Sequence, residues 1–167
     1  MRALQRCDQR RAGSRHGRGR TGPPGRRVTI ASDALVYRTA IVGCGRVAGT
    51  FDDDPARTAI WTHAGAYRAH PRTNLVAVAD LNPEALEAFG ARWNVPRLYA
   101  SASDLLAHEE VDILSVCTWS DTHREIASLG AEAGVKAIWC EKPFARNLTE
   151  ADAILDGCQN LVLAVNH

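Results

Sequence analysis

Short apolar runs alternate with helix-like segments from residue 37 onward, and this alternation limits the fold more than any other feature of the chain. Five runs that contain several Val, Ile, Leu or Ala residues are predicted as strands, over residues 37–42, 74–79, 111–118, 135–140 and 161–165, and Arg97-Leu98-Tyr99 is predicted as a further, brief strand. Strands that alternate with helices pair in parallel through right-handed crossovers. Near-continuous apolar strands indicate a sheet covered on both faces. We therefore predict an α/β fold, a doubly wound parallel sheet with strand order 3-2-1-4-5-6.

Capping residues mark two of the helices between these strands. Asn82, Pro83 and Glu84 supply an N-cap, a proline at the first helical position and an acid in the first turn, so a helix should run from there to about Trp93. The segment 149–152 resembles a capping box and should open another helix. Further helices are expected over residues 62–70, 104–108 and 121–134.

Charge divides the chain into a basic tail and an acidic domain. Residues 1–27 contain nine Arg and one Asp, whereas the remainder contains eleven Lys+Arg and eighteen Asp+Glu. The tail is dense in Arg, Gly and Pro and lacks apolar periodicity, so we expect it to be disordered and the dinucleotide-binding domain to occupy residues 37–167. A nucleic-acid arm, a transit peptide, a solvated tail or an over-extended gene start remain as interpretations of residues 1–27.

Several function classes are excluded by composition. No apolar run approaches the roughly 18–20 residues that cross a bilayer, and the acidic excess of the folded part argues against nucleic acid as a partner. The five cysteines form no C-x-x-C pair, which argues against a zinc site or a disulfide scaffold and favours a reducing, cytoplasmic setting. They are Cys7, Cys44, Cys117, Cys140 and Cys158.

A glycine-rich turn follows the first strand directly. Residues 43–48 read Gly-Cys-Gly-Arg-Val-Ala, a match to G-x-G-x-x-A. In such turns Gly43 permits a tight bend, Gly45 lets a pyrophosphate approach the backbone, and Ala48 keeps the following helix close to the sheet. The position of the turn after a strand favours a dinucleotide site over an ordinary loop.

Asp80 ends the second strand, where ligands bind in this fold. A carboxylate there can accept both hydroxyls of an adenosine ribose and would repel a 2′-phosphate, which favours NAD over NADP. The alternative is that Asp80 only starts the turn into Asn82 and Pro83.

The distance between Gly45 and Asp80 is 35 residues, against about 20 in the usual fingerprint. The excess lies in residues 49–58, where Pro55 cannot continue a helix. We expect one helical turn, a loop, and then the helix over 62–70. The run of acids at positions 52–54 is interpreted as exposed, solvated loop rather than as a metal site.

Polar residues also follow the fourth and fifth strands. Thr118, Trp119 and His123 come after the fourth, and Glu141 and Lys142 after the fifth. Lys142 could present its ammonium to a ribose hydroxyl or a substrate oxygen, or it could be an ordinary surface charge. His123 could contact the cofactor or serve only in the first turn of its helix.

These motifs together resemble the Gfo/Idh/MocA oxidoreductases, the family of glucose–fructose oxidoreductase and inositol dehydrogenase. The resemblance covers about residues 37–167, and Glu141-Lys142-Pro143 is its most specific part. It implies an N-terminal Rossmann domain that binds NAD or NADP, followed by an α/β domain that contacts a sugar or polyol substrate. Such a protein would transfer a hydride between the nicotinamide and a substrate hydroxyl.

The resemblance also implies a role for each residue. The turn, with Arg46 and Val47, would hold the pyrophosphate and Asp80 the adenosine ribose. Thr118, Trp119 and His123 would contact the middle of the cofactor. Glu141 and Lys142 would lie near the nicotinamide, with Lys142 as the catalytic residue that also reaches substrate.

Three departures from the family pattern limit the prediction. The family usually has proline where this chain has Trp119, which could stack on the cofactor or simply pack. The acidic insertion is a second departure. The sequence stops at Asn166-His167, near the family's junction to the substrate domain, so we expect a truncated, cofactor-binding half whose status as an enzyme is open. A dinucleotide-sensing regulator and a class I methyltransferase are the alternatives, and a homo-oligomer stays open.

Overall fold

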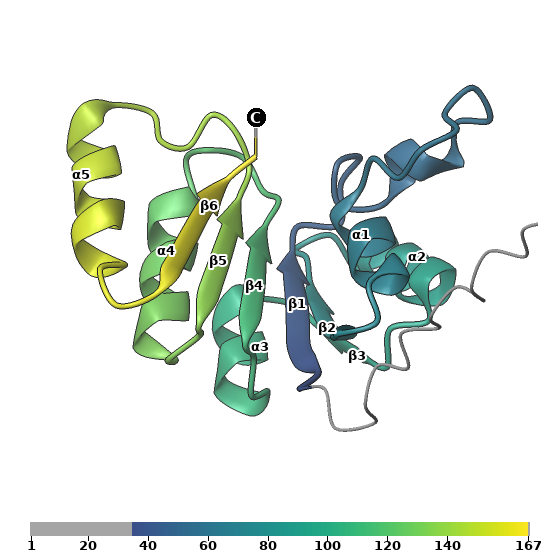
Figure 1. The fold of residues 1–167 in the computed structure, drawn as a ribbon, viewed down its shortest axis with the longest axis horizontal. Coiled ribbons are helices and arrows are strands. Elements are labelled where there is room, and N and C mark those ends of the chain that lie inside the picture. The colour runs from purple at the N-terminus through teal and green to yellow at the C-terminus, as the bar shows by residue number, and fades with distance from the viewer. Residues whose placement is uncertain (1–34, 167) are drawn as a thin grey trace, which may run out of the picture. The chain divides into compact units, whose positions relative to one another are not determined.

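A six-stranded sheet forms the centre of the computed structural model, which describes residues 35–166 (Figure 1). All neighbouring strands are parallel and the order is β3-β2-β1-β4-β5-β6, which confirms the predicted fold class and strand order. The strands are β1 Tyr37–Val42, β2 Thr73–Ala79, β3 Arg97–Tyr99, β4 Ile113–Val116, β5 Ala137–Cys140 and β6 Val162–Val165. The tail predicted over residues 1–27 lies outside the described residues.

Helices cover the sheet from both sides. The α1 and α2 helices lie on one face, and α3, α4 and α5 lie on the other (Figure 1). Their bounds are α1 His63–Ala69, α2 Pro83–Trp93, α3 Ala102–His108, α4 His123–Glu132 and α5 Leu148–Gly157, with a short 3₁₀ helix, η1, at Thr50–Asp53. None of the helices in residues 35–166 is both long and apolar enough to cross a membrane.

Capping explains where two helices begin. Asn82 caps α2 as predicted, because its side chain accepts the N–H groups of Glu84 and Ala85. The prediction that Thr149 opens the last helix is wrong. Asn147 is the N-cap of α5, and its side chain accepts the Glu150 N–H at 3.0 Å. Asparagine caps a helix at least as well as threonine, so the helix starts before the expected capping box.

Two apolar clusters form the core, one on each face of the sheet. Leu105, Leu114 and Ile138 are fully buried in the cluster beneath α3, α4 and α5. Ile41 and Val78 are fully buried in the cluster beneath α1 and α2. The second cluster does not reach the far edge of the sheet, since Val162 in β6 is 68% exposed. The core is thus centred on β1 and β4, whose carboxyl ends lie beside the glycine-rich turn.

Candidate nucleotide-binding site

The glycine-rich turn sits at the carboxyl end of β1 and packs against the end of β4. Gly43 has φ of +95°, and a Cβ built on it would lie 2.8 Å from the backbone carbonyl of Cys117. Only glycine fits such a position without strain. A Cβ built on Gly45 would meet nothing within 4 Å. The turn is therefore tight at Gly43 and open at Gly45, as a backbone that a pyrophosphate approaches needs to be.

An insertion interrupts the helix that the turn begins. The backbone N–H of His63 donates to Val47 O at 3.3 Å, and that of Ala64 donates to Ala48 O at 2.9 Å. The first residues of α1 thus hydrogen-bond to carbonyl groups of the turn. Residues 49–62 loop out between the turn and α1, and this segment is called the excursion below. This arrangement confirms the expected sequence of one turn, a loop and a helix.

The acidic run in this excursion has a structural role that the sequence interpretation missed. Asp52 accepts the backbone N–H of Trp61 at 2.7 Å and also the hydroxyl of Thr62, which caps α1. Asp53 accepts Nε of Arg92 in α2 at 2.7 Å. Asp52 and Asp53 therefore tie the excursion to α1 and α2 rather than only facing solvent. No cluster of three metal-ligating side chains occurs among residues 35–166.

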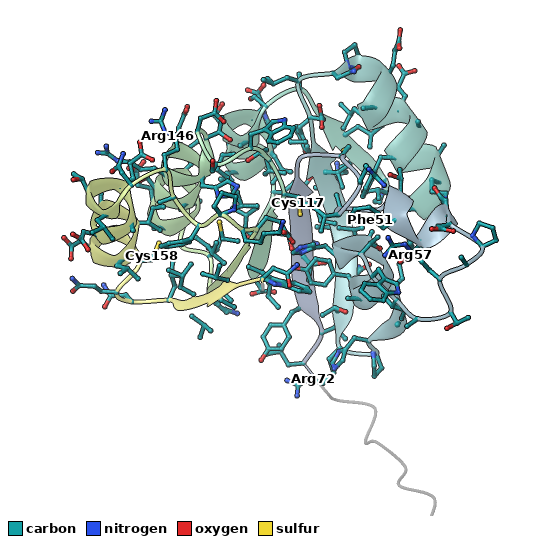
Figure 2. All side chains as sticks on the ribbon, turned by 90° about the horizontal axis from the view of Figure 1, so that it is seen from above. Phe51, Arg57, Arg72, Cys117, Arg146 and Cys158 are labelled. Carbon is teal, nitrogen blue, oxygen red and sulfur yellow. The ribbon has the colours of Figure 1, made fainter. Side chains whose placement is uncertain are left out.

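Stacked cations and aromatic rings connect the excursion to the turn. The Arg46 guanidinium lies 4.6 Å from the centre of the Phe51 ring, and the Arg57 guanidinium lies 4.7 Å from the same ring. Arg57 also lies 5.0 Å from the ring of Trp61. Figure 2 labels Phe51 and Arg57, which lie side by side. Arg46 is exposed, so it remains accessible to an anion at the turn.

Asp80 lies directly against the turn. One carboxylate oxygen accepts the Cys44 N–H at 2.6 Å and the other accepts the Asn82 N–H at 2.8 Å. The contact with Asn82 supports the interpretation that Asp80 starts the turn into α2. The contact with Cys44 also places Asp80 beside the glycine-rich turn, where a ribose-binding carboxylate is expected. A carboxylate oxygen carries two lone pairs, so each retains capacity for a ribose hydroxyl.

The loop after β4 presents one exposed and one supporting residue. Trp119 is 87% exposed, so it does not pack in the core. His123 is fully buried at the start of α4, with Nε2 3.0 Å from Thr118 O and Nδ1 3.2 Å from Phe144 O. Its ring joins the loops after β4 and β5. The geometry favours a structural role for His123 over contact with the cofactor, because both of its ring nitrogens already have protein partners.

Glu141 and Lys142 point in different directions. Lys142 is exposed at the carboxyl end of β5, as expected for a residue that meets a ligand. Glu141 is 4% exposed, and its Oε1 lies 2.7 Å from His63 Nε2 and accepts Asn166 Nδ2 at 2.6 Å. Glu141 thus lies at the predicted position, but its side chain turns into the protein.

A buried chain of polar side chains extends from Glu141 between α1 and the sheet. His63 Nδ1 lies 2.9 Å from Ser115 Oγ, which lies 2.6 Å from Tyr67 Oη. The Trp139 ring lies over His63, with 3.9 Å between ring centres. The sequence motifs did not predict this set of linked side chains. Ser115, a polar residue within the apolar strand β4, was the available signal.

Burial lowers the pKa of the His63 imidazole below its ordinary 6.5, although the hydrogen bond and charge of Glu141 oppose the shift. We therefore predict that stability falls in mild acid. Below about pH 6.5 the unfolded chain binds a proton that the folded chain does not, so the unfolding free energy drops by up to about 1.4 kcal/mol per pH unit. Above about pH 6.5 the neutral His63 makes its full contribution to the unfolding free energy.

Urea unfolding between pH 5 and pH 8 checks this prediction. His63→Gln should flatten the profile between pH 5 and 6.5. If the unfolding free energy of His63→Gln falls with pH as steeply as that of the original chain, a group other than His63 causes the loss of stability.

The thiols near the site are poor nucleophiles. Burial, together with the charge of Asp80, raises the pKa of Cys44 to about 12. Burial and the charge of Glu141 raise the pKa of Cys140 to about 12 as well. Because the thiolate is the reactive form, these cysteines act here as small apolar side chains.

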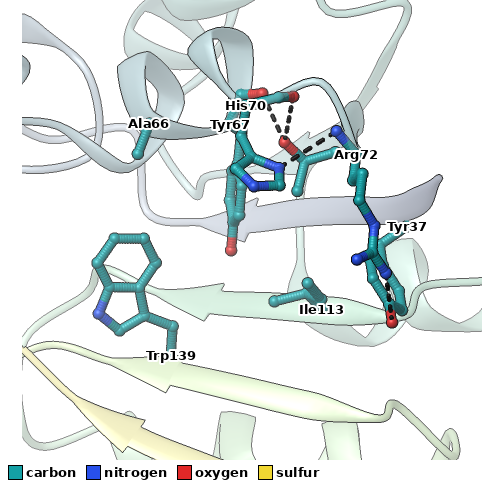
Figure 3. Close-up of a pocket in the computed structure, with 8 residues that line it drawn as sticks. Tyr37, Ala66, Tyr67, His70, Arg72, Ile113 and Trp139 are labelled. Atoms are coloured by element: carbon teal, nitrogen blue, oxygen red, sulfur yellow. Dashed lines mark hydrogen bonds between the residues drawn. The ribbon is translucent and has the colours of Figure 1, made fainter. Parts of the chain in front are cut away.

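A hollow of about 460 Å³ lies elsewhere, beside α1 (Figure 3). Its lining includes Tyr37, Thr73 and Ile113, which begin β1, β2 and β4. The hollow therefore lies towards the amino ends of the strands, whereas the predicted site residues lie at the carboxyl ends. Tyr67 and Trp139 also line it, so the buried polar chain ends beside this hollow.

The sequence matches the Gfo/Idh/MocA family, an oxidoreductase family with an NAD-binding Rossmann fold, over residues 37–167. The chain belongs to this family. The match confirms the resemblance, the fold, and the prediction of an NAD-binding domain from a sugar or cyclitol dehydrogenase family. It also removes the methyltransferase alternative.

Curated relatives are sugar and cyclitol dehydrogenases. D-apiose dehydrogenase from Paraburkholderia graminis is 32% identical over 123 residues, which are 74% of this chain and 29% of that protein. Inositol 2-dehydrogenase from Ralstonia nicotianae is 30% identical over 131 residues, or 78% of this chain and 33% of the relative. The chain therefore spans about a third of the length of these relatives.

Solved structures share the fold. The WlbA dehydrogenase from Bordetella pertussis, in complex with NADH and UDP-GlcNAcA, superposes with a TM-score of 0.67 at 32% identity. That match covers 78% of this chain and 37% of the other. An oxidoreductase from Agrobacterium radiobacter, in complex with NAD+, L-tartaric acid and magnesium, has a TM-score of 0.66 at 25% identity, with 78% and 35% covered.

Proposed function

We propose that this domain binds NAD across the carboxyl ends of its strands and serves an oxidoreductase that acts on a sugar or cyclitol hydroxyl. The observation that carries the proposal is the contact between Asp80 and the Cys44 N–H at 2.6 Å, beside the open position at Gly45. This contact brings a ribose acceptor and a pyrophosphate-binding turn together at one edge of the sheet.

In this proposal the residues at this edge contact successive parts of a dinucleotide. The Gly43–Ala48 turn, with Arg46 and Val47, would hold the pyrophosphate, since its backbone is open and Arg46 carries an exposed positive charge. Asp80 would accept hydroxyls of the adenosine ribose. Thr118 and the exposed ring of Trp119 would contact the middle of the cofactor. A flat, exposed indole suits stacking on a planar group.

Lys142 is the candidate for contact with both nicotinamide ribose and substrate. A bound nicotinamide would supply the hydride acceptor for the substrate carbinol, and a base would be needed for the hydroxyl proton. The Lys142 ammonium has three donors and can orient hydroxyl oxygens at this end of the sheet. In this proposal Glu141 supports Lys142 and does not touch the cofactor.

We further propose that the protein resides in the cytoplasm. Four cysteines among the described residues are free and buried, which fits the reducing cytoplasm. A sugar or polyol substrate would bind only in the presence of a second, substrate-binding domain.

Cofactor choice tests the role of Asp80. We expect NADH to bind about 5- to 150-fold more tightly than NADPH, because a 2′-phosphate beside the Asp80 carboxylate costs on the order of 1–3 kcal/mol. Asp80→Asn keeps an oxygen that can accept the Cys44 N–H and removes the charge, so most of the preference should disappear. Calorimetric titration of both proteins with both cofactors measures it. Equal affinities of the unsubstituted chain for NADH and NADPH would remove Asp80 from the ribose site.

A further inference from the structure

His63 contacts both the glycine-rich turn and the segment that carries Lys142. Its backbone N–H donates to Val47 O at 3.3 Å, and its Nε2 lies 2.7 Å from Glu141 Oε1. The side chain is 1% exposed. Neither the family match nor the sequence motifs assign it a role.

The hydrogen bonds around His63 have a single consistent direction when the imidazole is neutral. Nε2 faces a carboxylate oxygen, so Nε2 carries the proton and donates it to Glu141. Nδ1 is then an acceptor and takes the hydroxyl hydrogen of Ser115, whose oxygen in turn accepts the hydroxyl of Tyr67. Each donor has one acceptor, so the tautomer of His63 is fixed from both sides.

These bonds also fix the end of β5. Glu141 Oε1 receives His63 from one side and Asn166 Nδ2, at 2.6 Å, from the other. The other carboxylate oxygen of Glu141, Oε2, accepts the backbone N–H of Lys142 at 3.4 Å. The carboxylate that His63 holds thus also contacts the backbone of Lys142, which is exposed.

We propose that His63 is a positioning residue: by holding Glu141 inward, it sets Lys142 for the nicotinamide half of the cofactor. The inference rests on the proposed function, since it needs a dinucleotide at this edge. The backbone bond from His63 to Val47 survives any substitution of the side chain. Loss of the imidazole should therefore disturb the Lys142 end and leave the adenosine end intact.

Two amide variants of the 167-residue chain test the proposal. His63→Gln places an amide N–H near the position of Nε2, within reach of Glu141. His63→Asn has the same chemistry on a shorter side chain that cannot reach Glu141. ADP serves as the probe for the adenosine half and NADH as the probe for the whole cofactor. Thr39→Val is the matched control, because Thr39 Oγ1 is buried without a hydrogen-bond partner.

The expected result is selective. His63→Asn should weaken NADH binding about tenfold, the scale of one lost hydrogen bond to a charged group, while ADP affinity stays within about twofold. His63→Gln and Thr39→Val should bind both ligands as the original chain does. If His63→Asn does not fold, as judged by a thermal melt, Glu141→Asp replaces it. That variant also removes the hydrogen bond between residues 63 and 141, because the shorter side chain moves the carboxylate away from His63.

Other outcomes separate the two proposals. An original chain that binds neither ADP nor NADH overturns the proposed function. An original chain that binds NADH no more tightly than ADP overturns the positioning role. Equal losses of ADP and NADH affinity in His63→Asn, or no loss of either, also overturn it, since they would give His63 only a structural role or none.

Discussion

The 167-residue chain, purified and mixed with NAD+ and inositol or glucose, is expected to produce no NADH above background at 340 nm. Its described residues supply a cofactor-binding sheet and helices, and the match covers only 29–33% of the length of relatives that are named as dehydrogenases. Hydride transfer requires more than a bound cofactor. The carbinol carbon must be held close to the nicotinamide, and a base must take the hydroxyl proton.

Energies show why turnover by this chain is not expected. Orientation of two reactants is worth roughly 7–11 kcal/mol of barrier, and a positioned base contributes a further 10²- to 10⁴-fold. Lys142 by itself supplies neither a substrate pocket nor a second contact that fixes the substrate. The two factors together set the expected rate many orders of magnitude below that of an ordinary enzyme.

An assay for this prediction needs a binding control. The same preparation should bind NADH, so that absence of turnover is not due to misfolding. Turnover at ordinary enzyme rates would show that residues 1–167 contain a complete site, either within one copy or between two.

Gly43→Ala is expected to destabilise the fold strongly. Its Cβ would lie 2.8 Å from the carbonyl of Cys117, at a φ of +95°. The left-handed conformation costs about 1–2 kcal/mol, and the clash with backbone adds about 1–3 kcal/mol. Because the neighbour is the end of β4, no flexible side chain can move aside. A melting temperature lower by about 5–15 °C is expected.

Gly45→Ala is the matched control for this prediction. A Cβ at Gly45 would meet no protein atom within 4 Å, so the melting temperature should change little. NADH affinity should fall, because the methyl group occupies the space through which the pyrophosphate would approach. Thermal melts and NADH titrations of both variants measure the contrast. Equal melting temperatures for Gly43→Ala and the original chain would contradict the account of the turn.

Strand order and the positions of the site residues could be predicted because they depend on local patterns. Apolar runs such as β1 and β2 fix a parallel sheet, and in such a sheet the residues that follow each strand meet at one edge. Gly43, Asp80 and Lys142 are therefore brought to that edge by topology alone. The interrupted first helix was also predictable, because Pro55 cannot continue a helix.

Side-chain direction and long-range pairing could not be predicted in the same way. Glu141 points inward because His63, 78 residues earlier, and Asn166 both reach its carboxylate. Asp52 looked like solvated surface because its partners, Trp61 and Thr62, come close only after the excursion folds back. Asn147 caps α5, whereas the expected capping box began at Thr149. Sequence pattern alone does not resolve a difference of two residues in where a helix begins.

Titration of the ¹⁵N-labelled chain with NADH, followed by amide chemical shifts, shows which residues of the domain meet the cofactor. Saturable shifts are expected at the carboxyl edge, led by the amides of Gly45, Arg46 and Asp80, with small changes at Tyr37 and Arg72 beside the hollow. Shifts confined to the hollow, or no saturable shift at millimolar NADH, would contradict the assignment of this edge as the cofactor site.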